Sequence, residues 1–168
     1  LSCSSAASDV YKRQIPDYMI KVGIDPADDS FVEESSKKAN AIVQDFFSAE
    51  AYRRTEYAHL KPKIITTIAM FYDLDDPQPF VEDIYDILDD DGIWVLQLSY
   101  TPLMIKQLAF DNICHEHICY YSLSSMKYLM DRVGFDIVDC QLNDVNGGSF
   151  RIYLMKKTAN KTMLSLLN

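Results

Sequence analysis

The segment KIITTIAMFYDLDDPQPFVEDIYDILDDDGIWVLQLSY, residues 63–100, contains the strand, helix and second strand that decide the fold. Its two ends, 63–71 and 92–100, are apolar without alternation, which is typical of parallel strands covered by helices. Between them, the pair Asp76 and Pro77 predicts a helix start, and apolar residues then recur at helical spacing. The segment therefore predicts one strand-helix-strand unit of a parallel sheet.

The same alternation continues toward the amino terminus. The apolar runs at 18–25 and 41–47 predict two more buried strands. Residues 29–40 lie between them and carry acidic residues early and lysines late, the order that a helix dipole favours. We therefore expect a helix there, and the strand-helix pattern extends over the whole amino-terminal half.

Toward the carboxyl terminus, residues 123–133 place apolar side chains on one helical face, and Gly134 predicts the helix end. FDIVDCQL and SFRIYLMKK then form two strand-like runs joined through an NGG turn, which predicts a hairpin. The sequence thus predicts a doubly wound α/β sheet, Rossmann-like and mostly parallel, with a terminal antiparallel β-hairpin. Ligands of such sheets bind at the carboxyl ends of the strands.

The first 14 residues, LSCSSAASDVYKRQ, have no helical or strand periodicity. They resemble translated adapter sequence, so we expect residues 1–14 to be a non-native or disordered leader outside the fold. No glycine precedes Gly23, and we expect this sheet to lack its first strand and the glycine-rich loop that would follow it. The predicted organisation is a partial domain over 15–157 and a tail over 158–168.

Composition excludes several classes of function. Among 168 residues, 16 Lys and Arg stand against 25 Asp and Glu, and the net charge of -9 opposes binding to nucleic acid. The four cysteines form no C-x-x-C pair, which favours a reducing, cytoplasmic setting over a disulfide scaffold. No apolar stretch approaches the roughly 18 residues of a membrane span. We therefore expect a soluble protein with a small-molecule substrate.

Two acidic residues follow the first two visible strands. At the end of such a strand, Asp25 can accept hydrogen bonds from both hydroxyls of a ribose, although Asp25 and Pro26 could also simply start a turn. At the next strand end, Asp45 could accept from an adenine amino group while the ring of Phe46 covers the base. The alternative for Asp45 is a helix cap.

The densest group of reactive side chains lies in FDNICHEHICYYSL, residues 110–123. A neutral histidine such as His115 or His117 suits proton removal next to a carbonyl, and Glu116 could orient it. Two alternatives remain open, namely a metal site and a structural role in which the histidines only satisfy hydrogen bonds. The metal site would use Cys114, His115, His117 and Cys119, but their spacing matches no established zinc pattern, so we predict no metal.

The turn NDVNGGSFRIY supplies Asn146 and Arg151 beside two glycines that permit close backbone approach. The planar donor group of Arg151 suits a ligand with several acceptor oxygens. An ordinary hairpin turn is the alternative, because Asn-Gly is a strong hairpin signal.

Together, the ordered elements IDP, DFF, IAMFYDLDDP, GIWVLQLSY, FDNICHEH with YYSL, DRVGF and NGGSFR resemble the sugar C-methyltransferases that depend on S-adenosylmethionine (SAM), across about residues 18–157. The resemblance implies a class I methyltransferase fold, SAM as cofactor and a nucleotide-linked keto-sugar as acceptor. It also implies a zinc-binding domain before this one and a further domain after it.

Residue by residue, the resemblance implies that His117 is the general base, with Glu116 and His115 as its active-site neighbours, and that Asp25 binds the ribose. We expect Cys114, Tyr120, Asn146 and Arg151 on the substrate side. The family usually has tyrosine at the position of Cys114 and commonly histidine at the position of Asn146, so the identity of the sugar is open.

Two other functions fit the same elements. A SAM-dependent O- or N-methyltransferase of another small metabolite would share the sheet and the cofactor acids. A non-catalytic truncated fragment is the other alternative, and we expect the isolated 168-residue chain to be inactive because it lacks the glycine loop.

Overall fold

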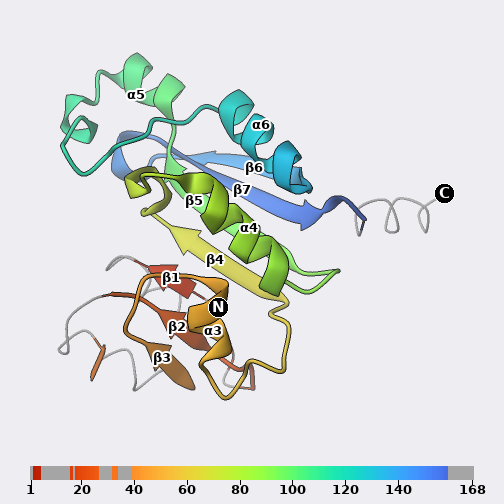
Figure 1. Cartoon of the computed structure of the whole chain (residues 1–168). Coiled ribbons are helices and arrows are strands. Elements are labelled where there is room, and N and C mark those ends of the chain that lie inside the picture. Colours follow the sequence, from red (N-terminus) through yellow and green to blue (C-terminus); the bar gives the residue numbers. More distant parts are fainter. Residues whose placement is uncertain (1, 5–15, 17, 27–31, 34–38, 159–168) are drawn as a thin grey trace.

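The computed structural model describes residues 2–4, 16, 18–26, 32–33 and 39–158, and every structural statement below concerns these residues. Within them the strands form one seven-stranded sheet with the order β3-β2-β1-β4-β5-β7-β6 (Figure 1). Only β7 runs antiparallel to its neighbours. The strands are β1 (Ser2–Ser4), β2 (Val22–Ile24), β3 (Ala41–Val43), β4 (Ile64–Ile68), β5 (Ile93–Ser99), β6 (Phe135–Asn143) and β7 (Ser149–Lys156).

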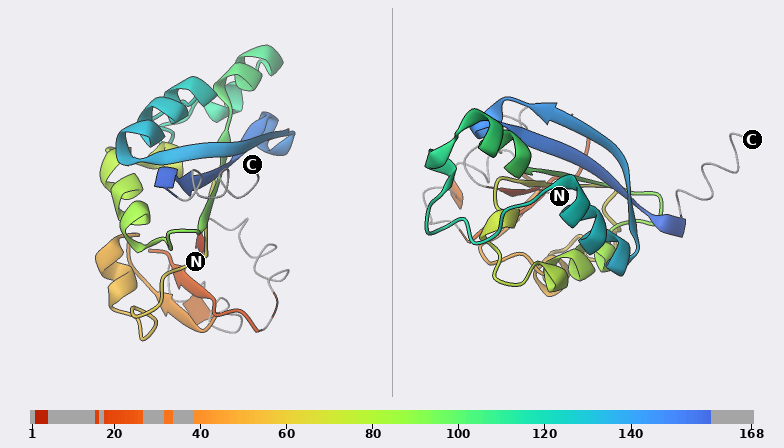
Figure 2. Two further views of the ribbon diagram at one scale, coloured as in Figure 1. Left: turned by 90° about the vertical axis from the view of Figure 1, so that its right-hand side faces the viewer. Right: turned by 90° about the horizontal axis from the view of Figure 1, so that it is seen from above.

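Helices α3, α4 and α6 lie side by side along one face of this sheet (Figures 1 and 2). Helix α5 follows β5 directly, and three short 3-10 turns connect the remaining elements. The α-helices are α3 (Ala49–Arg53), α4 (Pro77–Ile87), α5 (Thr101–Gln107) and α6 (Leu123–Val133), and the 3-10 turns are η1 (Phe71–Asp73), η2 (Phe110–Asn112) and η3 (Val145–Gly147). No helix in the described part is both long and apolar enough to cross a bilayer.

The predicted sheet class is confirmed, and so is the closing hairpin of β6 and β7. One expectation is corrected. Residues 1–14 were expected to stay outside the fold and the sheet to lack its first strand, but Ser2–Ser4 forms the central strand β1, which pairs in parallel with both β2 and β4. The inner edges of β2 and β4 present backbone N–H and C=O groups that any short extended segment can satisfy. Residues 5–15, where a loop would follow β1, lie outside the described residues.

Two helices begin and end where the sequence predicts. The side chain of Asp76 caps α4 by accepting from the N–H of Gln78 at 3.2 Å. Helix α6 ends at Gly134, whose φ of 110° lies in the left-handed region that favours glycine. Of the helix predicted over 29–40, Val32 and Glu33 are helical, residues 39–40 are not, and the remainder lies outside the described residues.

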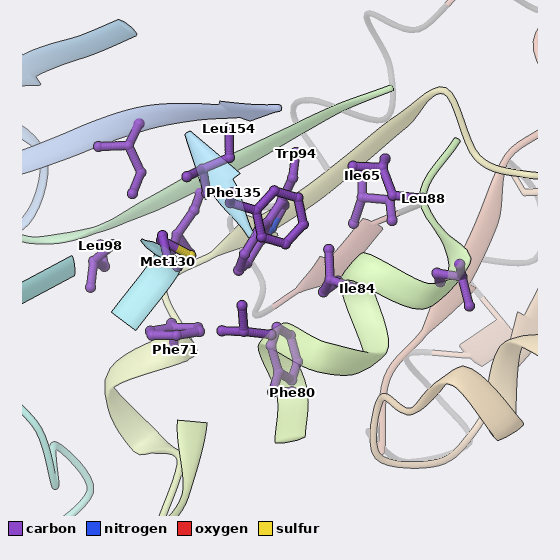
Figure 3. Packing of buried hydrophobic residues seen from close by; sticks show 14 of the residues in the cluster. Ile65, Phe71, Phe80, Ile84, Leu88, Trp94, Leu98, Met130, Phe135 and Leu154 are labelled. Carbon is purple, nitrogen blue, oxygen red and sulfur yellow. The ribbon is translucent and has the colours of Figure 1, made fainter. Parts of the chain in front are cut away.

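The core lies between the sheet and α4 and α6, and large aromatic side chains fill it (Figure 3). Trp94 of β5 is fully buried, and its indole N–H donates to the hydroxyl of Thr67 at 3.0 Å. Burying an indole without such an acceptor would cost free energy, so this bond allows tryptophan to fill the core. The ring of Phe71 packs edge-on against Phe80. This packing fixes η1, the turn that precedes α4 at the carboxyl end of β4.

Candidate active site at the carboxyl end of the sheet

The sheet has its switch point between β1 and β4, where the strand order reverses. Directly after β4, Ala69 adopts a φ of 54°, and its N–H donates to the carbonyl of Gln97 at 2.9 Å. This left-handed residue ends the strand and turns the chain into η1. The predicted strand over 63–71 therefore stops at Ile68, and the residues that follow it are brought to the sheet edge where ligands bind.

The predicted cofactor acids lie at neighbouring strand ends. Asp25 follows β2 and is partly buried, and its N–H donates to the carbonyl of Val43 at 3.0 Å, which joins the ends of β2 and β3. Asp45 follows β3 and accepts from the N–H of Phe46 at 2.8 Å and from the guanidinium of Arg54. These hydrogen bonds, the one from Arg54 first, lower the pKa of Asp45.

Asp45 is therefore a surface carboxylate that stays ionised, and it is not the cap of α3. That role belongs to Ser48, whose hydroxyl accepts from the N–H of Ala51 at 3.0 Å. The side chain of Phe46 is 77% exposed, so its ring is open to solvent. An exposed aromatic ring next to Asp45, with Asp25 at the neighbouring strand end, suits the adenosine half of a nucleotide.

His117 is held by the backbone. It lies partly buried in the loop after η2, and its Nδ1 lies 2.8 Å from the carbonyl oxygen of Asn112. A carbonyl only accepts hydrogen bonds, so Nδ1 carries the proton, and in the neutral ring Nε2 bears a free lone pair. The ring of Tyr72 packs against the imidazole with centroids 4.2 Å apart. This arrangement prepares Nε2 of His117 to accept a proton.

The two neighbours of His117 in the HEH segment point to solvent. The side chains of His115 and Glu116 are 92% and 75% exposed, and they face each other with Nε2 and Oε1 3.9 Å apart. Glu116 was predicted to orient the base, but the group that bonds His117 is the carbonyl of Asn112. A different acid, Asp73 of η1, interacts electrostatically with His117. Burial raises the pKa of Asp73, His117 lowers it, and Glu116 raises it further.

Tyr72 stays neutral at any physiological pH. Burial is the main cause that raises its pKa to about 12, and Asp73 and Cys114 add to the effect. Because the folded pKa exceeds the unfolded value of about 10, the stability that neutral Tyr72 contributes is complete below pH 10 and is lost as the pH rises toward 12. Tyr72 can therefore pack against His117 and donate a hydrogen bond, but it does not act as a base.

We expect the Tyr72→Phe variant to lose less stability than the parent between about pH 8 and pH 11, because it removes one of the buried phenols that ionise on unfolding. Denaturant midpoints measured at both pH values give the difference. Tyr128→Phe, at a position that is 69% exposed, is the control and should follow the parent. An equal alkaline loss in the parent and in Tyr72→Phe would contradict the assignment.

Two of the predicted substrate-side residues lie close to Asn112, and a third, Asn146, belongs to η3, whose Gly147 packs against Asn112. Cys114 lies two residues after it, and the hydroxyl of Tyr120 donates to its carbonyl at 3.3 Å. Asn146 lies in η3, and the next residue, Gly147, has a φ of 71° and packs so closely that an added Cβ would lie 3.3 Å from the Asn112 amide nitrogen. The NGG turn thus packs against Asn112 of η2, just before the loop that carries His115 and His117 (residues 113–119).

Arg151 is the fourth predicted substrate-side residue, and a partner from within the sheet engages it. Its Nε and Nη2 both donate to the side-chain oxygen of Gln97, at 2.9 and 2.7 Å, across the paired strands β5 and β7. A signal for this partner was present in the sequence, since Gln97 interrupts the apolar run of β5 and needs a hydrogen-bond partner when buried.

Other residues of the site had no assigned role at the level of sequence. Asn112 stands inside the quoted FDNICHEH motif, but the group that acts is its carbonyl, which has no residue-type signature. Tyr72 follows an apolar strand, and nothing in the sequence distinguishes it from a tyrosine that only packs in the core. Among the described residues, no group of three or more His, Cys, Asp and Glu side chains could hold a metal ion.

The strand order and the site at its switch point define a class of protein, which the solved structures confirm. A SAM-dependent methyltransferase from Thermotoga maritima superimposes with a TM-score of 0.58 at 16% identity, covering 82% of this chain and 73% of that one. The plantazolicin methyltransferase BpumL, solved with S-adenosylhomocysteine (SAH), gives 0.63 at 13% identity, with coverages of 92% and 75%. The N-methyltransferase NodS from Bradyrhizobium japonicum gives 0.63 at 11%, with coverages of 92% and 83%. The fold is that of SAM-dependent methyltransferases.

Residues 6–139 match the methyltransferase domain family, and the chain belongs to it. The C-methyltransferase NovU of Streptomyces niveus is 27% identical over 139 residues, which make up 83% of this chain and 33% of NovU. The chain therefore spans about a third of the length of this relative. The cofactor of the class is SAM.

The described residues fit the adenosine half of SAM. Asp25 would accept from the ribose hydroxyls, Phe46 would cover the adenine, and Asp45 could still accept from its amino group because each carboxylate oxygen has more than one lone pair. The residues directly after β1, which would face the methionine half, fall within 5–15 and lie outside the described residues.

Proposed function

We propose that this domain methylates carbon next to the ketone of a small sugar-like substrate, with a nucleotide-linked keto-sugar as acceptor. The observation that carries the proposal is the hydrogen bond from Nδ1 of His117 to the carbonyl of Asn112, which leaves Nε2 as the base on a ring that packs against Tyr72, after the carboxyl end of β4. Transfer of methyl to oxygen or nitrogen needs a base only to remove a proton from a heteroatom, whereas carbon must first be made nucleophilic by losing a proton α to a carbonyl. The likeness to NovU, a C-methyltransferase, supports the same reaction.

In the proposed reaction, Nε2 of His117 removes the α proton, and the C–H electron pair moves into the enolate. The Asn112 carbonyl accepts from Nδ1–H throughout, so it stabilises the imidazolium as the ring becomes positive. The Tyr72 ring packs against the imidazole at an interplanar angle of 51° and limits its rotation. Asp25, Asp45 and Phe46 would hold SAM, which would supply an electrophilic methyl group to the enolate carbon and leave as SAH. The protein contributes alignment and a base with a fixed tautomer.

Some of the similar structures favour a second candidate, since NodS is an N-methyltransferase. Under that alternative, His117 would be dispensable or would only assist deprotonation of an amine or a hydroxyl. We further propose that the chain is part of the methyltransferase region of a longer protein. The activity would then belong to that full-length protein, and the coverage of NovU supports this proposal.

Location of the transferred methyl separates the two candidates. We expect the full-length protein, given SAM with a 13C-labelled methyl and a 13C-labelled keto-sugar nucleotide, to yield a product whose methyl carbon shows one-bond carbon-carbon coupling. Coupling of this kind requires a new C–C bond. A labelled methyl without that coupling, bonded to oxygen or nitrogen, would contradict C-methylation and support the second candidate.

A further inference from the structure

One buried hydrogen bond joins β5 to η2, just before the loop that carries His117. At the carboxyl end of β5, the hydroxyl of Ser99 donates to the side-chain oxygen of Asn112 at 3.1 Å. Both residues are buried, with exposed fractions of 8% and 5%. A buried polar pair of this kind fixes a local conformation, because breaking it leaves a polar group without its partner away from water.

Asn112 uses its two ends differently. Its side chain is anchored to the sheet through Ser99, while its carbonyl oxygen accepts from Nδ1 of His117 at 2.8 Å and from the hydroxyl of Tyr120 at 3.3 Å. The carbonyl belongs to the last residue of η2, a single 3-10 turn. Such a short turn has little cooperative stability of its own. The side-chain anchor is therefore one of the contacts that set where the carbonyl points.

The anchor is also enclosed from the side of the hairpin. An added Cβ on Gly147 would lie 3.0 Å from the Cβ of Ala109 and 3.3 Å from the amide nitrogen of Asn112. The NGG turn thus packs against η2 and leaves little room for Asn112 to adopt another rotamer. Sheet, hairpin and η2 together hold one carbonyl oxygen.

We propose that Ser99 and Asn112 are positioning residues that select the tautomer of His117: the anchored carbonyl keeps the proton on Nδ1 and leaves Nε2 free for catalysis. The proposal rests on the proposed function of His117 as the base. Neither residue touches the reacting atoms. Without the bond from Ser99, the carbonyl is held less firmly against Nδ1, and His117 samples both tautomers more evenly.

Nitrogen NMR of the 168-residue chain tests the tautomer directly, because the chain has only three histidines. With 15N-labelled histidine, we expect His117 of the parent to carry its proton on Nδ1, and His115, which is 92% exposed, to show the free tautomer mixture. In Ser99→Ala, His117 should shift toward the pattern of His115. Thr67→Val is the matched control, because it removes another buried hydroxyl that bonds Trp94 and should leave His117 unchanged.

In the full-length protein, Ser99→Ala should lower kcat roughly tenfold, the population change that loss of one such hydrogen bond produces, with KM for SAM unchanged. Ser99→Thr, which keeps the hydroxyl, should restore both kcat and the tautomer. An unchanged His117 spectrum in Ser99→Ala, or the same shift in Thr67→Val, overturns the proposal. Failure of the proposed function looks different, since the tautomer would still depend on Ser99 while the parent removed no α proton from a ketone.

Discussion

The His117→Asn variant of the full-length protein is expected to transfer methyl about a hundred- to ten-thousand-fold more slowly than the parent, the usual cost of removing a general base. Asparagine can still donate a hydrogen bond to the Asn112 carbonyl, so the loop should keep its conformation. Affinity for SAM should hardly change, since the proposed cofactor contacts are Asp25, Asp45 and Phe46 and do not include His117. Product formation at saturating SAM and calorimetric titration with SAH measure the two quantities separately.

His59→Asn is the control for this experiment. His59 also bonds a backbone carbonyl through Nδ1, that of Glu56 at 3.0 Å, but it is exposed and lies after α3. It should keep full activity. Loss of activity in His115→Asn with retention in His117→Asn would contradict the assignment and move the base to His115, and methyl transfer that persists in both would favour an oxygen or nitrogen methyltransferase.

Loss of the ribose-binding carboxylate should have the second large effect, this time on cofactor affinity. Asp25→Ala removes an acceptor that would take two charge-assisted hydrogen bonds, each contributing roughly 1.5–3 kcal/mol, so we expect SAM affinity to fall at least a hundredfold. Titration calorimetry of the full-length protein with SAM measures it.

Asp45→Ala gives the informative comparison for that result. Both oxygens of Asp45 already accept hydrogen bonds, one from Phe46 and one from Arg54, and the side chain is exposed. Asp45 would make a single hydrogen bond to the adenine amino group, against two ribose bonds for Asp25, so its removal should weaken SAM by less than Asp25→Ala does. Equal losses, or a larger loss in Asp45→Ala, would mean that the acid after β3 is the main cofactor contact and that Asp25 only turns the chain.

The parts of the fold that were predictable from sequence carry their signals locally. The Asp76 and Pro77 pair gives the start of α4, and Gly134 gives the end of α6, because a cap and a left-handed residue each depend on a few neighbouring atoms. Strand β1 depends instead on pairing with β2 and β4, which are distant in sequence. Three small residues without periodicity contain no trace of that pairing.

The site divides in the same way. His117 stands out by residue type, but its partner is a backbone carbonyl, and every residue has one. Arg151 was predicted to bind substrate, yet the register of β5 and β7 places it opposite Gln97, and only the register reveals that pair. Residue type thus predicts which groups can do chemistry, while strand register and loop packing determine which of them are already engaged.

Deuterium exchange tests the central claim most directly, that Nε2 of His117 removes a proton from carbon. The full-length protein is placed in heavy water with SAH bound in place of SAM. It should exchange the hydrogen on the carbon next to the ketone of a keto-sugar nucleotide for deuterium, because deprotonation can proceed when no methyl is available. The His117→Asn variant should not. Exchange at the parent rate in His117→Asn would contradict the assignment of the base, and binding of the keto-sugar by the parent without any exchange would contradict the enolate mechanism itself.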